Sequence, residues 1–252
     1  VGAIVDQVAS YFLYKENLWN MGAKKASGDS LIFIDADVIY KNPDWVTNVE
    51  EALKTCDVLQ PFTKAMWLDE FGHLERDRVP NSSQLVSGER ISLGTGHPGF
   101  GWAMTKEAYE KIGGWYDIAA NGAGDVAFVF SLASQSQFEL VMQHFPNQDR
   151  MVLTPSFRKY RKHVSSLGLT VGEVPECLVH HKWHGTIRNR RYCRRDKCLP
   201  RVENYEYDLN RRADGILVWG DEKSALAFKE LFSDRLDDGT PPKVVFVSKD
   251  SR

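Results

Sequence analysis

The sequence predicts an α/β domain whose Rossmann-like central sheet is mixed, mainly parallel and flanked by helices. Ser30 to Asp35 reads SLIFID, an apolar run of strand length that is typical of a strand covered on both faces. Segments with the apolar spacing of helices lie on either side of this run. The length of 252 residues fits one large domain, and we expect a single domain over residues 1–252.

The composition is that of an ordinary globular protein and excludes several classes. Hydrophobic residues make up 42% and charged residues 26%, which excludes collagen-like and low-complexity chains. The net charge of −2 argues against a protein that coats nucleic acid through its overall charge. No apolar run approaches the roughly 18 residues of a membrane span. The four cysteines form no disulfide framework, so a reducing, cytoplasmic location is expected.

The first part of the chain alternates helix and strand signals. Apolar spacing predicts a helix over residues 15–27, and the strand over residues 30–35 follows at once. Pro43 at a first helical position predicts a helix to about Lys54. Residues 57–61 are typical of another short strand.

The middle of the chain begins with a long polar stretch from Phe71 to Pro98. Its length and its Gly, Ser, Asn and Arg content predict a mobile binding loop or lid. A strand is then expected around residues 99–104, followed by a helix that Thr105 caps and Gly113 ends. A glycine-rich turn over residues 121–124 precedes a further helix.

The last third predicts shorter elements. Strands are expected near residues 151–153 and 177–181, where they close the same part of the sheet. Residues 216–219 and 243–247 are typical of short strands around an amphipathic helix over residues 224–232.

Two carboxylates follow the first buried strand. Asp35 and Asp37 come at its carboxyl end, where open α/β sheets bind their ligands, and they point to the same side of an extended segment. Together they can share one divalent cation, which would neutralise a diphosphate. The alternative is a pair of aspartates that form a turn or cap a helix.

Several motifs resemble the metal-dependent glycosyltransferases with the GT-A fold. The resemblance covers residues 12–237 and is closest to galactosyl- and N-acetylgalactosaminyl-transferase-like enzymes of bacteria and phages. The motifs, in chain order, are NMGAKKASGDSLIFIDADV (Asn20 to Val38), GFGWAMTKEAYEKIGGW (Gly99 to Trp115), GAGD (Gly122 to Asp125), HKWHG (His181 to Gly185) and NRRYCRR (Asn189 to Arg195).

The resemblance implies a cation site for Mn²⁺ or Mg²⁺. Asp35 and Asp37 would bind the cation and the diphosphate of the nucleotide sugar, His184 would be a third protein ligand, and His181 a further ligand or a partner of one. The alternative for the histidines is a strand end with surface side chains. The site therefore requires Asp37 and His184 to converge in space.

The resemblance also implies a general base. Asp125 would remove the proton from the acceptor hydroxyl if the enzyme inverts the anomeric centre. The family often has two adjacent acids at this point, whereas Gly124 and Val126 flank Asp125 here. The alternative is that Asp125 caps the helix that follows.

Further site residues are expected from the same resemblance and from the local charge. For the donor these are Lys15, Asn20, Asp35, Arg188 and Arg191, and for the acceptor Gly101, Trp102 and Gly124. The arginines belong to residues 158–201, which hold twelve Lys or Arg against three acids and suit forked bonds to phosphate. A solvated helix face is the alternative for many of them, and core packing is the alternative for Trp102.

The expected organisation has three parts. Residues 1–61 would be the donor and metal half, 62–201 the acceptor half with a closing basic segment, and 202–252 a carboxyl-terminal extension. Members of this family begin with nucleotide-binding strands, but only 34 residues precede Asp35. Either the donor half is truncated, or the strand Lys243 to Asp250 takes its place beside residues 31–34.

The sequence thus predicts a glycosyltransferase that transfers a sugar from a nucleotide donor, with a UDP-sugar expected, to a hydroxyl acceptor. The acceptor would be a glycan or, less in keeping with the sequence, a modified DNA base. A non-catalytic carbohydrate- or nucleic-acid-binding module on the same fold is the alternative from another class. A second enzymatic alternative is a metal-dependent nucleotidyltransferase, which also uses a divalent cation to neutralise phosphate charge.

Overall fold

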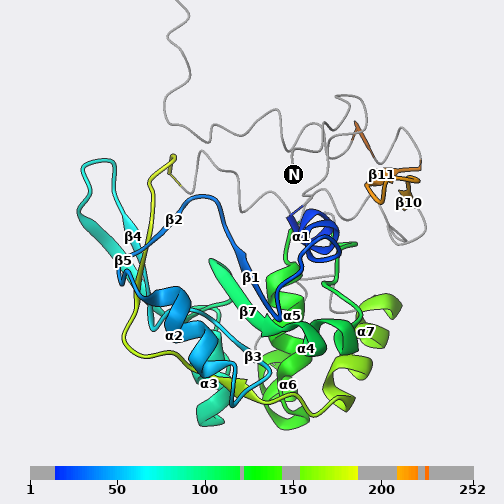
Figure 1. The fold of residues 1–252 in the computed structure, drawn as a ribbon, viewed down its shortest axis with the longest axis horizontal. Helices are drawn as coiled ribbons and strands as arrows, with labels where there is room; N and C mark the ends of the chain where they lie inside the picture. Colours follow the sequence, from blue (N-terminus) through cyan, green and yellow to red (C-terminus); the bar gives the residue numbers. More distant parts are fainter. Residues whose placement is uncertain (1–14, 120–121, 144–153, 187–208, 221–224, 227–252) are drawn as a thin grey trace, which may run out of the picture.

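The computed structural model describes residues 15–119, 122–143, 154–186, 209–220 and 225–226. In these ranges the protein is a mixed α/β structure with seven helices and eleven strands (Figure 1). The helices are α1 (Lys15–Ala23), α2 (Trp45–Ala52), α3 (Asn81–Ser87), α4 (Lys106–Ile112), α5 (Gly124–Leu132), α6 (Gln135–Gln143) and α7 (Pro155–Ser166). No helix in these ranges has the length and apolar character to span a bilayer.

A four-stranded sheet forms the centre of the molecule. Its order is β1 (Ser30–Ile34), β7 (Gly101–Thr105), β3 (Val58–Leu59) and β8 (Val171–Gly172). Strand β7 is antiparallel to β1 and to β3, whereas β3 and β8 are parallel. Three of the four strands therefore run in one direction, and β7 runs the other way between β1 and β3. The sheet is mixed, as predicted, but two of its three strand pairings are antiparallel, whereas the sequence predicts mainly parallel pairings.

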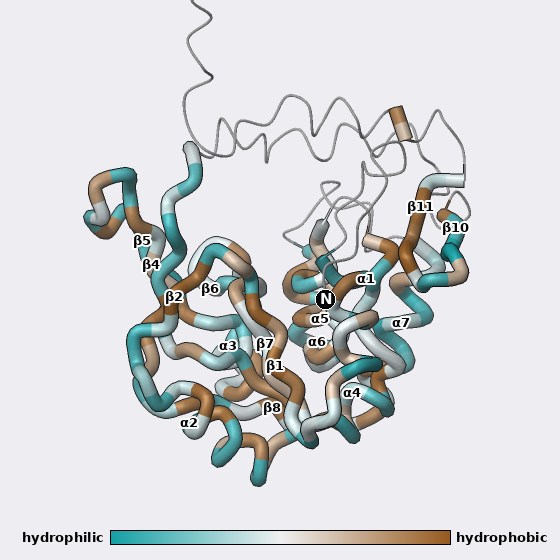
Figure 2. The backbone as a smooth tube through the Cα atoms, turned by 45° about the horizontal axis from the view of Figure 1, so that its top comes forward, coloured by the Kyte–Doolittle hydropathy of each residue, from teal (hydrophilic) through white to brown (hydrophobic). Residues whose placement is uncertain are grey.

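Strand β1 is covered on both faces, as its unbroken apolar run predicts. Leu31 and Phe33 pack in the cluster formed with α4, α5 and α7, while Ile32 packs against the cluster around α2. Figure 2 shows β1 as a largely hydrophobic segment in the interior. Helices therefore flank this sheet on two sides, and only Ile34, at the carboxyl end of β1, is exposed.

A second sheet carries the continuation of β1. Its order is β2 (Val38–Tyr40), β9 (Leu178–His181), β4 (Lys64–Leu68), β5 (Leu74–Pro80) and β6 (Gly96–His97). Strand β9 pairs antiparallel with β2 and parallel with β4. The strand predicted at residues 177–181 is thus present, but it belongs to this sheet and does not close the central one. Only Asp35, Ala36 and Asp37 separate β1 from β2.

A two-stranded sheet lies beside α1 near the end of the described chain (Figure 1). It consists of β10 (Leu209–Arg211) and β11 (Leu217–Trp219). Asn17 of α1 fixes it, because its Nδ2 donates to Gly215 O at 3.1 Å and its Oδ1 accepts from Leu217 N at 3.1 Å. The strand predicted at residues 216–219 is therefore present.

The polar stretch from Phe71 to Pro98 is not a loop, which corrects the sequence prediction. It folds into β5, α3 and β6, and β5 forms an antiparallel pair with β4. Glutamine side chains satisfy its backbone groups: Ser82 N donates to Oε1 of Gln60, outside the stretch, at 3.0 Å, and Ser92 N donates to Oε1 of Gln84, within it, at 2.9 Å. A composition typical of loops here builds a buried hydrogen-bond network.

Other predicted boundaries are met or shifted. Thr105 caps α4 and Gly113 ends it with a positive φ of 78°, as expected, whereas α1 ends at Ala23 and not at residue 27. Helices α6 and α7 were not predicted. The strands expected near residues 151–153 and 243–247, and the helix over residues 224–232 apart from Ala225 and Leu226, lie outside the described residues.

Candidate functional site

The site lies where the chain passes from the central sheet to the second sheet. A cavity of about 680 Å³ opens at this point, and Asp35 and Asp37 line it. Helix α1 contributes Lys15 and Glu16 to its wall, and helix α5 contributes Asp125. Segments that are distant in the sequence therefore meet at the carboxyl end of β1, as expected for an α/β sheet.

Asp37, His181 and His184 converge into one cluster. The antiparallel pairing of β2 with β9 places Val38 opposite His181, and Lys182 N donates to Asp37 O at 2.8 Å. Asp37 Oδ2 lies 3.0 Å from His184 Nε2 and 3.3 Å from His181 Nε2, and the two imidazole nitrogens are 3.2 Å apart. The convergence that the sequence required is thus present.

The cluster has the dimensions of a metal site. Metal–ligand bonds of about 2.1 Å separate two ligand atoms by about 3.0 Å at a right angle and about 3.4 Å at a tetrahedral angle. The three observed separations fall in this interval. One carboxylate oxygen and two imidazole nitrogens can all direct lone pairs at a common cation, whereas two facing imidazoles cannot both donate to each other. The donor set therefore fits a divalent transition-metal ion.

The pKa of Asp37 suits a cation ligand. Burial works to raise the pKa of Asp37, but the hydrogen bond from His181 and the charges of His181 and His184 outweigh it and lower the pKa to about 2. The carboxylate is therefore ionised at any pH at which the imidazoles are neutral. Residue His181 is itself buried, and the ring of Phe100 stacks on it with centroids 5.2 Å apart.

Asp35 is placed differently from the other predicted ligands. Its Oδ2 accepts from Phe100 N at 3.2 Å, and its Oδ1 lies 3.5 Å from Lys15 Nζ. Phe100 adopts a φ of 71°, which is unusual for a bulky residue and brings its N–H to the carboxylate. Asp35 thus orients the wall of the cavity and stands outside the group of three ligands that the structure brings together.

Lys15 holds several acids together at the other side of the cavity. Its Nζ lies 3.3 Å from Asp125 Oδ2 and 3.7 Å from Glu16 Oε1, in addition to Asp35. Burial works to lower the pKa of Lys15, but Asp125, Asp35 and Glu16 together raise it well above its usual value. The ammonium is therefore permanently charged and neutralises part of the acid cluster.

Asp125 lies in the first turn of α5, where it accepts from Val126 N at 2.8 Å. The N-cap position is Ala123, so the predicted alternative of Asp125 as the capping residue is not met. Burial works to raise the pKa of Asp125, but Lys15, His97 and the hydrogen bond from Val126 lower it overall. The carboxylate is ionised at neutral pH and faces the cavity.

Glu16 is a site residue that the sequence did not indicate. Its side chain lines the cavity, the residue is only 1% exposed, and Oε1 has no hydrogen-bond partner among the described residues. Burial raises the pKa of Glu16 to about 7, against the attraction of Lys15. Gly124 is required beside it, because a Cβ there would lie 2.6 Å from Glu16 Oε1. The only available signal was the position of Glu16 next to Lys15.

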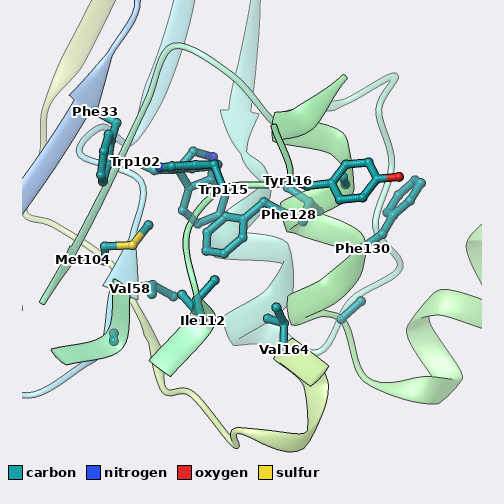
Figure 3. Close-up of a cluster of buried hydrophobic side chains, with 14 of the residues drawn as sticks. Phe33, Val58, Trp102, Met104, Ile112, Trp115, Tyr116, Phe128, Phe130 and Val164 are labelled. Carbon is teal, nitrogen blue, oxygen red and sulfur yellow. The ribbon is translucent and has the colours of Figure 1, made fainter. Parts of the chain in front are cut away.

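Two of the predicted substrate-binding residues, Asn20 and Trp102, have structural roles in the fold. Asn20 makes four hydrogen bonds, to the backbone of Trp115 through both ends of its amide and to the side chains of Tyr109 and Asp117. Trp102 is fully buried in the core beside Trp115 and Phe128 (Figure 3). Neither side chain lines the cavity, and the position of Trp102 favours the alternative of core packing.

The remaining predicted residues are glycines and arginines. Gly101 and Gly124 are buried positions that exclude a side chain, since an added Cβ would lie 2.6 Å from Tyr40 Oη or from Glu16 Oε1, respectively. Neither lines the cavity directly. Arg188 and Arg191, and the strand Lys243 to Asp250 proposed to replace a donor strand, lie outside the described residues.

No family model, no curated protein and no solved structure matches the chain. The function of the site is therefore inferred from its own geometry and chemistry.

Proposed function

We propose that this protein is a metal-dependent glycosyltransferase of the GT-A type, which transfers a sugar from a UDP-sugar to a hydroxyl acceptor. The observation that carries the proposal is the convergence of Asp37 with His181 and His184 at a cavity that also exposes Asp125. These residues come from three of the motifs on which the resemblance rests. Their meeting in one cavity is the arrangement that such an enzyme needs.

The proposed donor side consists of the three-residue cluster. Asp37, His181 and His184 would hold Mn²⁺ or Mg²⁺, and the cation would neutralise the diphosphate of the donor as it departs. Asp35, which also lines the cavity, accepts from Phe100 N, and Phe100 in turn packs on His181. Asp35 thus acts by positioning the cluster.

The proposed base is Asp125. A carboxylate suffices because the acceptor hydroxyl becomes acidic only as its oxygen attacks an oxocarbenium-like carbon. The ion pair with Lys15 keeps Asp125 deprotonated before the reaction and fixes the direction of its Oδ2. Lys15 would therefore serve the base, in place of the donor contact that the sequence predicted. Glu16, whose pKa is near 7, would form a hydrogen bond with a substrate hydroxyl beside Asp125.

The test is a screen of UDP-sugars and GDP-sugars that measures nucleotide release with Mn²⁺ or Mg²⁺. The wild-type protein is compared with Asp37→Asn, Asp125→Asn and a control, Asp44→Asn. Asp44 is exposed and makes no side-chain capping bond, so its substitution should change nothing. We expect Asp125→Asn to lose at least about 100-fold in turnover while it still binds UDP with Mn²⁺. We expect Asp37→Asn to lose the metal-dependent binding itself.

Other outcomes would redirect the assignment. Full turnover in Asp125→Asn would remove this residue from the role of base. Release of pyrophosphate would indicate a nucleotidyltransferase. Binding of a glycan or of DNA without any nucleotide binding would favour the non-catalytic module, a function for which the arginine-rich residues 188–195 provide the chemical basis.

A further inference from the structure

Strand β5 presents two arginines, Arg76 and Arg78, to the cavity on one face and the exposed Asp77 on its other face. Successive side chains of a strand alternate between its faces, and Arg76 and Arg78 are half-buried while Asp77 between them is exposed. Asp77 forms an ion pair with Lys64, with Nζ and Oδ2 3.0 Å apart. Arg76 and Arg78 both line the 680 Å³ cavity. The strand therefore delivers two positive charges to the same wall.

Trp67 and a backbone carbonyl hold these guanidinium groups in place. The Arg76 Cζ lies 4.4 Å from the centroid of the Trp67 ring, and the Arg78 Cζ lies 5.7 Å from it. Arg78 also donates from Nη1 to Leu93 O at 2.6 Å. Such contacts pre-organise the planar donors of arginine, so that less conformational freedom is lost when an anion binds.

The two guanidinium groups share their cavities with acids but form no ion pair with them among the described residues. No carboxylate there forms an ion pair with either, although Glu70 and Glu75 line a smaller cavity of about 230 Å³ that Arg76 shares. The Arg76 Nε is buried and has no hydrogen-bond partner in the described part of the chain. Burial lowers the pKa of Arg78, and the charge of the neighbouring Arg76 lowers it further. An anion between them would relieve this repulsion.

The two arginines line the same cavity as the proposed base and the Asp37–His181–His184 cluster. The Trp67 ring, on which they stack, lies 4.7 Å from the His97 ring and 6.2 Å from the His181 ring, and His97 Nε2 and Asp125 Oδ2 both face Gly99. A Cβ placed on Gly99 would be 2.8 Å from Asp125 Oδ2 and 3.3 Å from His97 Nε2. Burial lowers the pKa of His97 to about 3, so the imidazole is neutral and separates the charges without adding one. An acceptor whose hydroxyl lies at Asp125 would extend past His97 toward Trp67, on which the arginines stack.

We propose that Arg76 and Arg78, oriented by Trp67, form a subsite for a carboxylate or phosphate on the acceptor sugar. The substrate class is then an anionic glycan, such as one that contains a uronic acid or a sugar phosphate. The assignment of the anion to the acceptor rests on the proposed function. The other source of such an anion is the diphosphate of the donor.

The test measures binding in the absence of turnover. The probes are methyl glucuronide, its uncharged counterpart methyl glucoside, and UDP, each added with Mg²⁺ and followed by ligand-observed NMR. The proteins are the wild type, Arg76→Gln, Arg78→Gln and the control Arg90→Gln, whose side chain is exposed and lines neither cavity. Circular dichroism establishes that each variant is folded.

We expect the wild type to bind the glucuronide at least tenfold more tightly than the glucoside. Arg76→Gln and Arg78→Gln should abolish this preference and leave the affinity for UDP within twofold of the wild type. Equal affinity for the two glycosides, or no binding of the glucuronide, would overturn the subsite. Loss of UDP affinity in place of the glucuronide preference would assign the arginines to the donor diphosphate and overturn the acceptor assignment.

The same data separate this inference from the proposed function. An arginine-dependent preference for the glucuronide in a protein that does not bind UDP would keep the subsite and refute the transferase. Binding of UDP with metal but without any preference for the anionic glycoside would refute the subsite and leave the proposed transferase in place.

Discussion

Glu16 illustrates how a single buried side chain sets the protonation of this cavity. Its pKa in the folded protein is about 7, whereas an exposed glutamate has a value of 4.5. Between these two pH values the folded state binds more protons than the unfolded state, so the free energy of unfolding falls as the pH rises. Burial is the main cause, and Asp125 and Asp35 add repulsion that Lys15 partly offsets.

We therefore expect the substitution Glu16→Gln to change the pH dependence of stability. The amide fills the same volume and never ionises, so the variant should gain stability relative to the wild type as the pH rises from about 5 to 8. The full difference is on the order of 3 kcal/mol. Urea unfolding across this pH range measures it. A difference that is constant with pH would show that Glu16 is ionised throughout.

Sequence patterns indicated the residues of the cluster and Asp125 but not their environment. Asp37, His181 and Asp125 stand in motifs that have a recognisable order, so their chemistry was predictable. Glu16 and Arg78 stand in no motif, and their roles depend on which neighbours the fold brings to them. The reverse holds for Trp102, whose aromatic ring suited a sugar but whose position on β7 buries it in the core.

Helix α4 shows how far local signals determine an element. The Thr105 hydroxyl accepts from Ala108 N at 3.0 Å, and the helix ends at Gly113 in the left-handed conformation that favours glycine. Both ends were predictable because the capping groups are within a few residues of the backbone that they satisfy. The same helix follows directly on β7, which pairs with β1 at the site.

The cap gives a quantitative prediction. Thr105→Ala should lower the free energy of unfolding by about 1 kcal/mol, because Ala108 N loses its acceptor. Thr105→Ser keeps the hydroxyl and should recover most of the loss. Paired thermal and urea unfolding of the two variants provides the measurement, and an alanine variant as stable as the serine variant would mean that the cap contributes nothing.

Strand β5 and helix α3 could not be predicted by the same reasoning. The sequence LERDRVP carries four consecutive charged residues and no apolar alternation, so the different roles of its two faces become apparent only when one face lies on Trp67 and the cavity. Helix α3 buries Asn81, Ser82 and Gln84, residues that occur mainly on the surface. Their partners lie at Gln60 and Ser92, outside the window of any local pattern.

A metal ion bound at the Asp37–His181–His184 cluster should raise the stability of the whole folded protein. An ion that binds only the folded state stabilises it by about 2.7 kcal/mol at 100 times its dissociation constant. We therefore expect Mn²⁺ to raise the melting temperature of the wild type, a chelator to reverse the effect, and His184→Ala to abolish it. His180→Ala is the matched control, since His180 is the neighbour of His181 on β9 and is outside the cluster.

An equal rise of the melting temperature in His184→Ala and in the wild type would place the bound ion elsewhere in the protein. A rise that survives in His180→Ala but not in His184→Ala would assign it to the cluster. Differential scanning fluorimetry at several Mn²⁺ concentrations distinguishes these results, because specific binding shifts the midpoint with the logarithm of the free metal concentration.

The three-residue link from β1 to β2 has a mechanical consequence. Asp37 directly precedes β2 and His181 ends β9, both in the second sheet, whereas Lys15, Glu16 and Asp125 are on helices beside the central sheet. The separation between the three-residue cluster and Asp125 therefore depends on how the two sheets are placed relative to each other.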